Sequence, residues 1–123
     1  MILVDTSVWI DHLRSNEPTL AMALQSGEVL GHPFVVGELA CGNLRNRAAV
    51  MVNLRELPVA AVATDLEAIA FIDGRSLMGL GIGYIDVHLL ASAALTPDTR
   101  LWTRDRRLAE IADRFRLGFR ENG

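Results

Sequence analysis

Four carboxylates lie at the edges of apolar segments, where a charged side chain is costly. They are Asp5, Glu38, Asp86 and Asp105. A charged acid beside an apolar core needs a cationic partner or a metal ion. Because all four acids share this setting, one bound divalent cation explains them together, and oxygen-rich sites of this kind suit Mg²⁺ or Mn²⁺. The set therefore predicts metal-assisted chemistry on a phosphodiester.

Each acid also has a simpler explanation when it is considered alone. Asp5 and Asp105 stand where helix N-caps are expected. Asp86 would favour a helix N-terminus electrostatically. Glu38 is the most informative, because it lies within a predicted helix, where a cap role is not available, and its alternative is a buried ion pair with an arginine. One shared metal site accounts for the four acids better than four separate explanations.

The expected elements alternate between short apolar strands and helices. Strands are predicted at residues 2–4, 29–31, 59–63 and 100–103, with a candidate edge strand at 117–119; helices are predicted at 6–13, 18–27, 33–42, 47–57, 66–78, 84–95 and 105–115. This order indicates an α/β fold with a mainly parallel sheet that helices cover on both sides. Ligands bind beyond the carboxyl ends of such strands, which is where Asp5 and Asp105 lie.

The composition is that of one ordinary domain spanning residues 1–123, since half of the residues are hydrophobic and no repeat or linker divides the chain. The net charge of −3 argues against a generally basic nucleic-acid binder. However, residues 100–123 hold 7 arginines and only 4 acids. Arginine binds phosphate through a planar fork. Arg104, Arg106 and Arg107 are therefore candidate RNA contacts, and a solvated helix face is the equal alternative.

The remaining residue types exclude several kinds of site. Cys41 is the single cysteine, so no internal disulfide or cysteine cluster can form, and a packed thiol is expected. The three histidines lack the spacing of a zinc site. No cleavable signal and no membrane-spanning stretch is predicted, so the expected compartment is the cytoplasm.

Several segments together resemble one known family. They are residues 1–10 (Met-Ile-Leu-Val-Asp-Thr-Ser-Val-Trp-Ile), 37–39 (Gly-Glu-Leu), 83–91 (Gly-Tyr-Ile-Asp-Val-His-Leu-Leu-Ala) and 101–105 (Leu-Trp-Thr-Arg-Asp). In order and spacing they resemble the motifs of PIN-domain ribonucleases, and most closely those of the VapC toxins of bacterial toxin–antitoxin pairs. The resemblance covers essentially the whole chain and keeps the order of all four acids.

The resemblance implies a fold and a set of roles. The fold would be a compact three-layer α/β/α sandwich around a central, mainly parallel sheet. By motif position the four acids match the quartet that holds Mg²⁺ or Mn²⁺ in this family. Thr103 matches the hydroxyl residue of the Thr-x-Asp motif, and Thr6 or Ser7 would support the site. Some members carry a further acid just after the Asp105 position, where this chain has an arginine, so the number of metal ions stays open.

The resemblance also implies an activity and partners. The chain would be a metal-dependent endoribonuclease toxin that hydrolyses RNA and leaves a 5′-phosphate and a 3′-hydroxyl. Members commonly form homodimers. They are neutralised by a small antitoxin, here of the VapB type, which often blocks the acidic site with a basic side chain.

Three other functions fit parts of the pattern. A phosphoacceptor signalling domain would need a lysine near the phosphoryl group, and the chain has no lysine. A phosphatase with a nucleophilic aspartate usually shows Asp-x-Asp after its first strand, whereas this chain has Asp5-Thr6-Ser7. A non-catalytic PIN-like interaction module, whose acidic pocket docks a basic partner side chain, is the main alternative, although an intact set of four acids makes it less economical.

Overall fold

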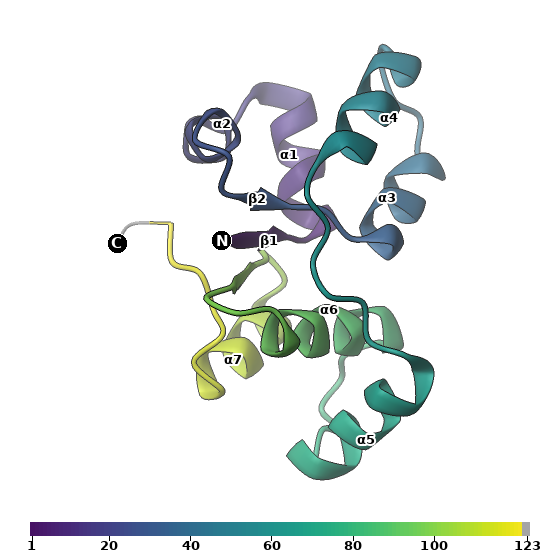
Figure 1. Cartoon of the computed structure of the whole chain (residues 1–123), viewed down its shortest axis with the longest axis vertical. Helices are drawn as coiled ribbons and strands as arrows, with labels where there is room; N and C mark the ends of the chain where they lie inside the picture. The colour runs from purple at the N-terminus through teal and green to yellow at the C-terminus, as the bar shows by residue number, and fades with distance from the viewer. Residues whose placement is uncertain (122–123) are drawn as a thin grey trace.

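Three parallel strands form the centre of the molecule in a computed structural model that describes residues 1–121 (Figure 1). Strand β1 (Ile2–Val4) lies between β2 (Val29–Leu30) and β3 (Arg100–Trp102). Every strand residue except Arg100 is buried. These strands are continuous apolar runs because both faces of a parallel sheet are covered.

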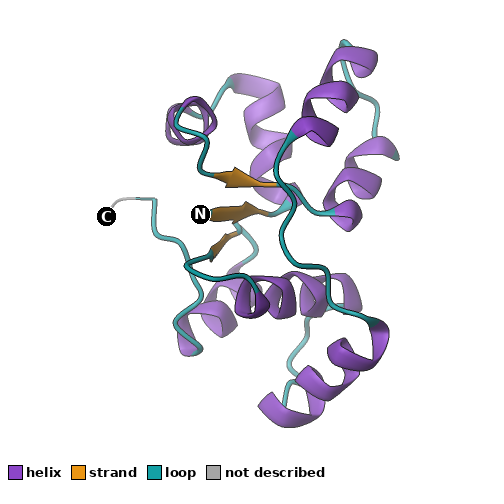
Figure 2. Cartoon of the chain, in the orientation of Figure 1, coloured by secondary structure: helices purple, strands orange, loops and turns teal. Residues whose placement is uncertain are grey.

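Seven helices flank these strands in the described part of the chain (Figure 2). They are α1 (Thr6–Ser15), α2 (Pro18–Gln25), α3 (Pro33–Ala40), α4 (Arg47–Glu56), α5 (Asp65–Arg75), α6 (Tyr84–Leu95) and α7 (Arg106–Arg114). In Figure 1, α1 to α4 lie on the β2 side of the strands and α5 to α7 on the β3 side. This arrangement confirms the predicted α/β fold with a parallel sheet between helices.

Helix α6 is the most deeply packed element outside the sheet. Its residues 87–93 are all buried, so this part of the helix is enclosed on all sides, as expected of a core helix. Its side chains Leu89 and Leu90 join Leu3, Val4 and Leu101 of the strands in the core, and each is at most 1% exposed. The helix therefore holds its N-terminal end, which carries Asp86, in a fixed place beside the sheet.

The predicted strand at residues 59–63 is wrong beyond its first residue. Val59 forms one parallel bridge with Gly31, through Gly31 N–H to Pro58 O (2.8 Å) and Ala60 N–H to Gly31 O (3.0 Å). The ladder stops there because β2 is short and the chain enters α3 at Pro33. The candidate edge strand at 117–119 is likewise reduced to a parallel bridge, between Leu101 and Gly118.

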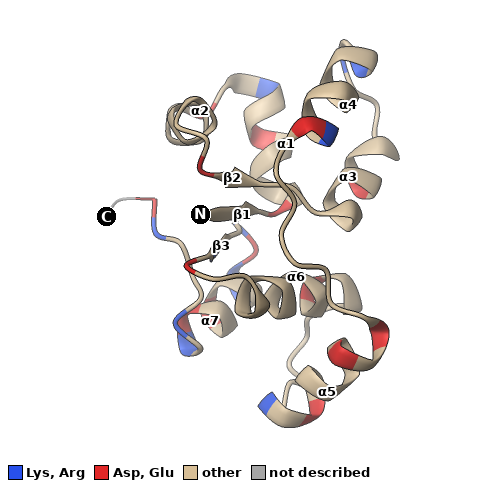
Figure 3. Cartoon of the chain, viewed as in Figure 1, with Lys and Arg blue, Asp and Glu red and all other residues tan. Residues whose placement is uncertain are grey.

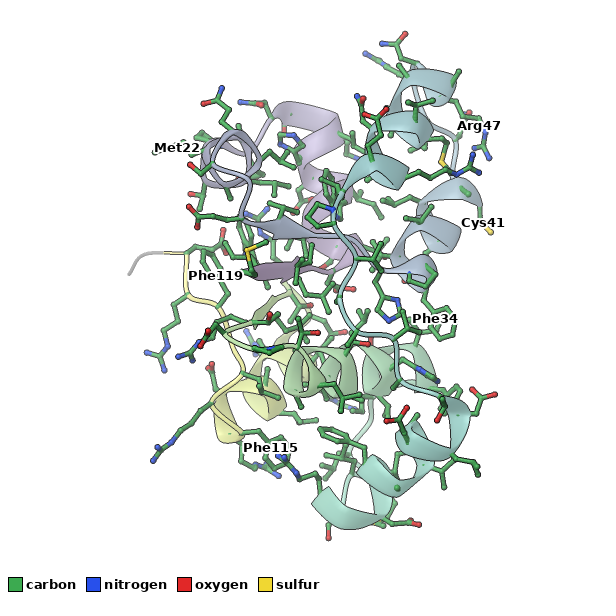
Figure 4. The ribbon with its side chains drawn as sticks, viewed as in Figure 1. Met22, Phe34, Cys41, Arg47, Phe115 and Phe119 are labelled. Atoms are coloured by element: carbon green, nitrogen blue, oxygen red, sulfur yellow. The ribbon has the colours of Figure 1, made fainter. Side chains whose placement is uncertain are left out.

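The thiol of Cys41 is exposed, so the expectation of a packed cysteine is wrong. The residue follows the last turn of α3, and its side chain points away from the rest of the molecule (Figure 4). The apolar sequence around it is explained by the opposite face of α3, where Val35 and Leu39 are buried. Among the described residues no helix is long and apolar enough to cross a membrane.

Candidate metal centre

The four acids come from four elements that meet at one edge of the sheet. Asp5 directly follows β1, Asp105 begins α7 just after β3, Glu38 lies in α3 and Asp86 lies in the first turn of α6. Helices α3 and α6 lie on opposite sides of the strands, and both carry acidic positions (Figure 3). The pKa of Asp86 is raised by burial first and then by the negative charges of the other three acids, while the N–H of Gly83 acts in the opposite direction. The other three carboxylates therefore lie near enough to Asp86 for their charges to act on it.

Asp5 is 7% exposed and two hydroxyl groups hold its carboxylate. Its Oδ2 accepts hydrogen bonds from Ser7 Oγ (2.8 Å) and Thr103 Oγ1 (2.7 Å). Ser7 Oγ in turn accepts a hydrogen bond from the backbone N–H of Arg104 (3.0 Å), and Thr103 Oγ1 accepts one from the backbone N–H of Asp105 (3.1 Å). Although Asp5 occupies the N-cap position of α1, its side chain makes no cap hydrogen bond. The cap explanation therefore fails for Asp5, whose Oδ2 is instead fixed as an acceptor.

Glu38 is exposed and its Oε1 accepts a hydrogen bond of 2.8 Å from Thr6 Oγ1. The alternative of a buried glutamate paired with an arginine is wrong, since Glu38 forms no ion pair within residues 1–121. Thr6 and Ser7 are neighbours at the start of α1, and they bind two different acids. The sequence left open which of them would support the site; in the structure each donates a hydrogen bond to one of the four acids.

Asp86 and Asp105 each satisfy a helix N-terminus with one oxygen. Asp86 Oδ2 accepts from Gly83 N–H (3.3 Å), and Asp105 Oδ1 accepts from Leu108 N–H (3.0 Å). The capping explanation is thus correct for Asp105, and Asp86 lies in the first turn of α6, as the electrostatic explanation requires. In each case only one oxygen of the carboxylate is used. In all four acids, one oxygen takes hydrogen bonds and the other takes none from the described chain.

The donor chemistry fits a hard divalent cation. Four carboxylates with one unbonded oxygen each form an oxygen-only set, as Mg²⁺ and Mn²⁺ prefer. Over residues 1–121, no three Asp, Glu, His or Cys side chains are already gathered closely enough to make a ready metal cage. The hydrogen bonds described above hold each carboxylate in its position.

The three candidate RNA-binding arginines have different environments. The guanidinium of Arg104 is paired within the protein, with the carboxylates of Asp11 (2.7 Å), Glu17 (3.0 Å) and Glu121 (2.6 Å). Arg106 and Arg107 are exposed in the first turn of α7, next to Asp105.

Two buried histidines lie at the start of α3 (His32) and within α6 (His88). His32 Nδ1 accepts from Phe34 N–H at the start of α3, and its Nε2 lies 3.0 Å from Ser92 Oγ. His88 is 1% exposed and packs against the rings of Phe34 and Tyr84. Burial, with a smaller effect of His88, lowers the pKa of His32 to about 4. His32 is therefore a neutral residue of the core, and sequence spacing carried no signal that both histidines would be buried.

Comparison with known proteins agrees with this geometry. The chain matches the PIN domain family over residues 2–114. Ribonuclease VapC32 of Mycobacterium tuberculosis, in the strains CDC 1551 / Oshkosh and ATCC 25618 / H37Rv, is 45% identical over 108 residues, which cover 88% of this chain and 87% of the relative. All four acids and their supporting hydroxyls lie within the part that matches the family.

Proposed function

Because the chain belongs to the PIN-domain family, in its VapC-type ribonuclease branch, we propose that it is a metal-dependent endoribonuclease toxin held inactive by a cognate antitoxin. The observation that carries this proposal is the set of four carboxylates, each with one oxygen that accepts no hydrogen bond from residues 1–121. Carboxylates alone repel the phosphate of RNA. They become useful to RNA hydrolysis only when a cation reverses the local charge.

Each residue has a distinct task in the proposed reaction. Asp5, Asp86 and Asp105 would hold Mg²⁺ or Mn²⁺, and the bound ion would lower the pKa of a water ligand and stabilise charge on the leaving oxygen. Glu38 either joins the ligands or orients the attacking water. Thr103 orients the Asp5 carboxylate by donating a hydrogen bond to its Oδ2. Hydrogen-bond partners of this kind fix the orientation of metal ligands and affect metal affinity. Hydrolysis then leaves a 5′-phosphate and a 3′-hydroxyl.

Arg106 and Arg107 are the proposed RNA backbone contacts. Both are exposed beside Asp105, in the basic part of the chain. Neutralising both should weaken RNA binding and reduce its salt dependence, because each phosphate contact releases counterions. Unchanged affinity and salt slope in the double glutamine variant would contradict these contacts.

The same acidic region is the proposed docking point of a VapB-type antitoxin. Glu38 and Asp105 are exposed and negatively charged, so a basic side chain can pair with them and compete with the metal ion. We further propose that the protein acts as a cytoplasmic homodimer.

The decisive test is cleavage of total cellular RNA by purified protein, with Mg²⁺ or Mn²⁺ and with chelator. Asp5→Asn and Asp86→Asn should lower the rate at least about a hundredfold, since each removes a ligand charge. Asp73→Asn is the matched control, because Asp73 is an exposed acid of α5 outside the centre. Discrete metal-dependent fragments with 5′-phosphate ends are expected. Equal cleavage by wild type and ligand variants, or 2′,3′-cyclic phosphate ends, would contradict the mechanism and favour the binding-only module.

A further inference from the structure

The guanidinium of Arg104 joins three segments that are distant in sequence. It contacts Asp11 in α1 (2.7 Å), Glu17 between α1 and α2 (3.0 Å) and Glu121 near the C-terminus (2.6 Å). Its side chain is only 26% exposed, so solvent screens these pairs less than fully exposed ones. Its hydrogen bond also lowers the pKa of Glu17. The cluster therefore differs from an ordinary pair of surface charges.

Arg104 stands between Thr103 and Asp105, in the loop that leads from β3 to α7. Its backbone N–H donates to Ser7 Oγ (3.0 Å), and that hydroxyl donates to Asp5 Oδ2 (2.8 Å). The same residue thus reaches the first turn of α1 with its backbone and the next turn with its side chain. Positions four apart share one face of a helix, so the two attachments together fix the loop against that face.

We propose that Arg104 is a positioning residue of the candidate metal centre: it locks the loop of residues 103–105 onto α1, so that Thr103 meets Asp5 and Asp105 stays beside it. This inference rests on the proposed function, because it concerns the same metal ligands. It assigns to Arg104 a task within the protein rather than a contact with RNA.

The chemistry of the cluster requires arginine. Asp11, Glu17 and Glu121 would repel one another without a central cation. A guanidinium offers five N–H donors in a fixed plane, whereas an ammonium is a compact point charge. Removal of the positive charge therefore leaves three uncompensated acids at the point where the loop attaches, and repulsion should push the loop away from α1.

The test compares Arg104→Gln and Arg104→Lys with Arg55→Gln. Arg55 is an exposed arginine of α4 that forms no hydrogen bond or ion pair with the described residues, so its variant controls for the loss of one positive charge. Mn²⁺ affinity is measured by calorimetry at fixed ionic strength, and amide hydrogen exchange is followed at residues 103–106. Arg104→Gln should weaken Mn²⁺ binding about tenfold, as loss of an outer partner typically does, and should speed exchange in the loop. Arg104→Lys should show a smaller effect on both, and Arg55→Gln none.

Several results would overturn the inference. Mn²⁺ affinity and loop exchange equal to wild type in Arg104→Gln would do so. A raised KM for RNA at saturating Mn²⁺, with unchanged Mn²⁺ affinity, would show instead that Arg104 contacts RNA. If Arg104→Gln does not fold, Asp11→Asn and Glu121→Gln each remove one partner of the guanidinium, and wild-type loop exchange in both would reject the proposal. Hydrogen exchange separates the two proposals: if wild type binds no Mn²⁺ but Arg104→Gln still loosens the loop, the metal centre fails and the attachment stands.

Discussion

The hydroxyl of Thr103 donates a hydrogen bond of 2.7 Å to the carboxylate of Asp5, across 98 positions of sequence. The register of the sheet explains this contact. Val4 pairs with Trp102 in the parallel strands β1 and β3, and Asp5 N–H continues the ladder to Trp102 O (2.9 Å). Asp5 is the residue that follows β1, and Thr103 is the residue that follows β3. Strand pairing therefore brings Asp5 and Thr103 to neighbouring positions at the ends of their strands.

Thr103→Val should weaken metal binding and catalysis. Valine keeps the shape of threonine but removes the donor to Asp5 and the acceptor for the Asp105 N–H. We expect Mn²⁺ affinity and kcat to fall by about tenfold or more, the usual effect of losing an outer hydrogen bond to a metal ligand. Thr103→Ser retains the hydroxyl and should stay close to wild type. Titration with Mn²⁺ checks this, and equal affinities for valine and serine would disprove the role.

Asp86→Asn should stabilise the metal-free protein while it destroys metal binding. Burial and the charges of neighbouring acids raise the pKa of Asp86, so its ionised form is costly in the folded state. In wild type this cost is present above the folded pKa and disappears as the pH falls through it. The melting temperature in chelator should therefore be higher for Asp86→Asn at pH 7 to 8, and the difference should shrink in acid.

Asp73→Asn is the control for this comparison, because it removes an exposed acid outside the centre. Wild-type stability should exceed that of Asp86→Asn only when Mn²⁺ is added. A variant that is less stable than wild type in chelator would mean that the hydrogen bond from Gly83 outweighs burial and repulsion.

Sequence patterns predicted the parts of this molecule that depend on neighbouring residues. The helix at residues 84–95 was predicted with its observed ends, whereas the helix predicted at 66–78 is observed at Asp65–Arg75. The acids were recognisable because each one interrupts or ends an apolar segment.

Features that depend on how elements meet could not be predicted in this way. The ion pairs of Arg104 join residues up to 93 positions apart, and the predicted strand after Pro58 depended on the length of its partner β2. The exposed thiol of Cys41 likewise reflects which face of α3 packs inward, which the apolar sequence around it did not reveal.

His32 should make the protein less stable in mild acid. Its pKa is about 4 in the folded protein, below the ordinary value of 6.5, so it is neutral in the core. Below pH 6.5 the unfolded chain takes up a proton that the folded chain does not, and stability is lost progressively down to about pH 4. Urea unfolding at several pH values should show this slope. The asparagine of His32→Asn can still cap α3, and this variant should reduce the dependence of stability on pH. If the pH dependence persists in His32→Asn but vanishes in His12→Asn, the effect belongs to His12.

Gly81→Ala should destabilise the loop before α6 in a way that depends on Arg107. Gly81 has φ +83°, where a non-glycine residue costs about 1–2 kcal/mol, and an added Cβ would also collide with the guanidinium of Arg107. In an Arg107→Ala background the collision disappears but the backbone cost remains. A double-mutant cycle from urea unfolding should therefore give a smaller cost for Gly81→Ala in that background. Gly74→Ala, within α5 and with open space around it, should be neutral or stabilising. Equal costs of Gly81→Ala in both backgrounds would show that Arg107 yields without strain and that the backbone conformation alone requires glycine.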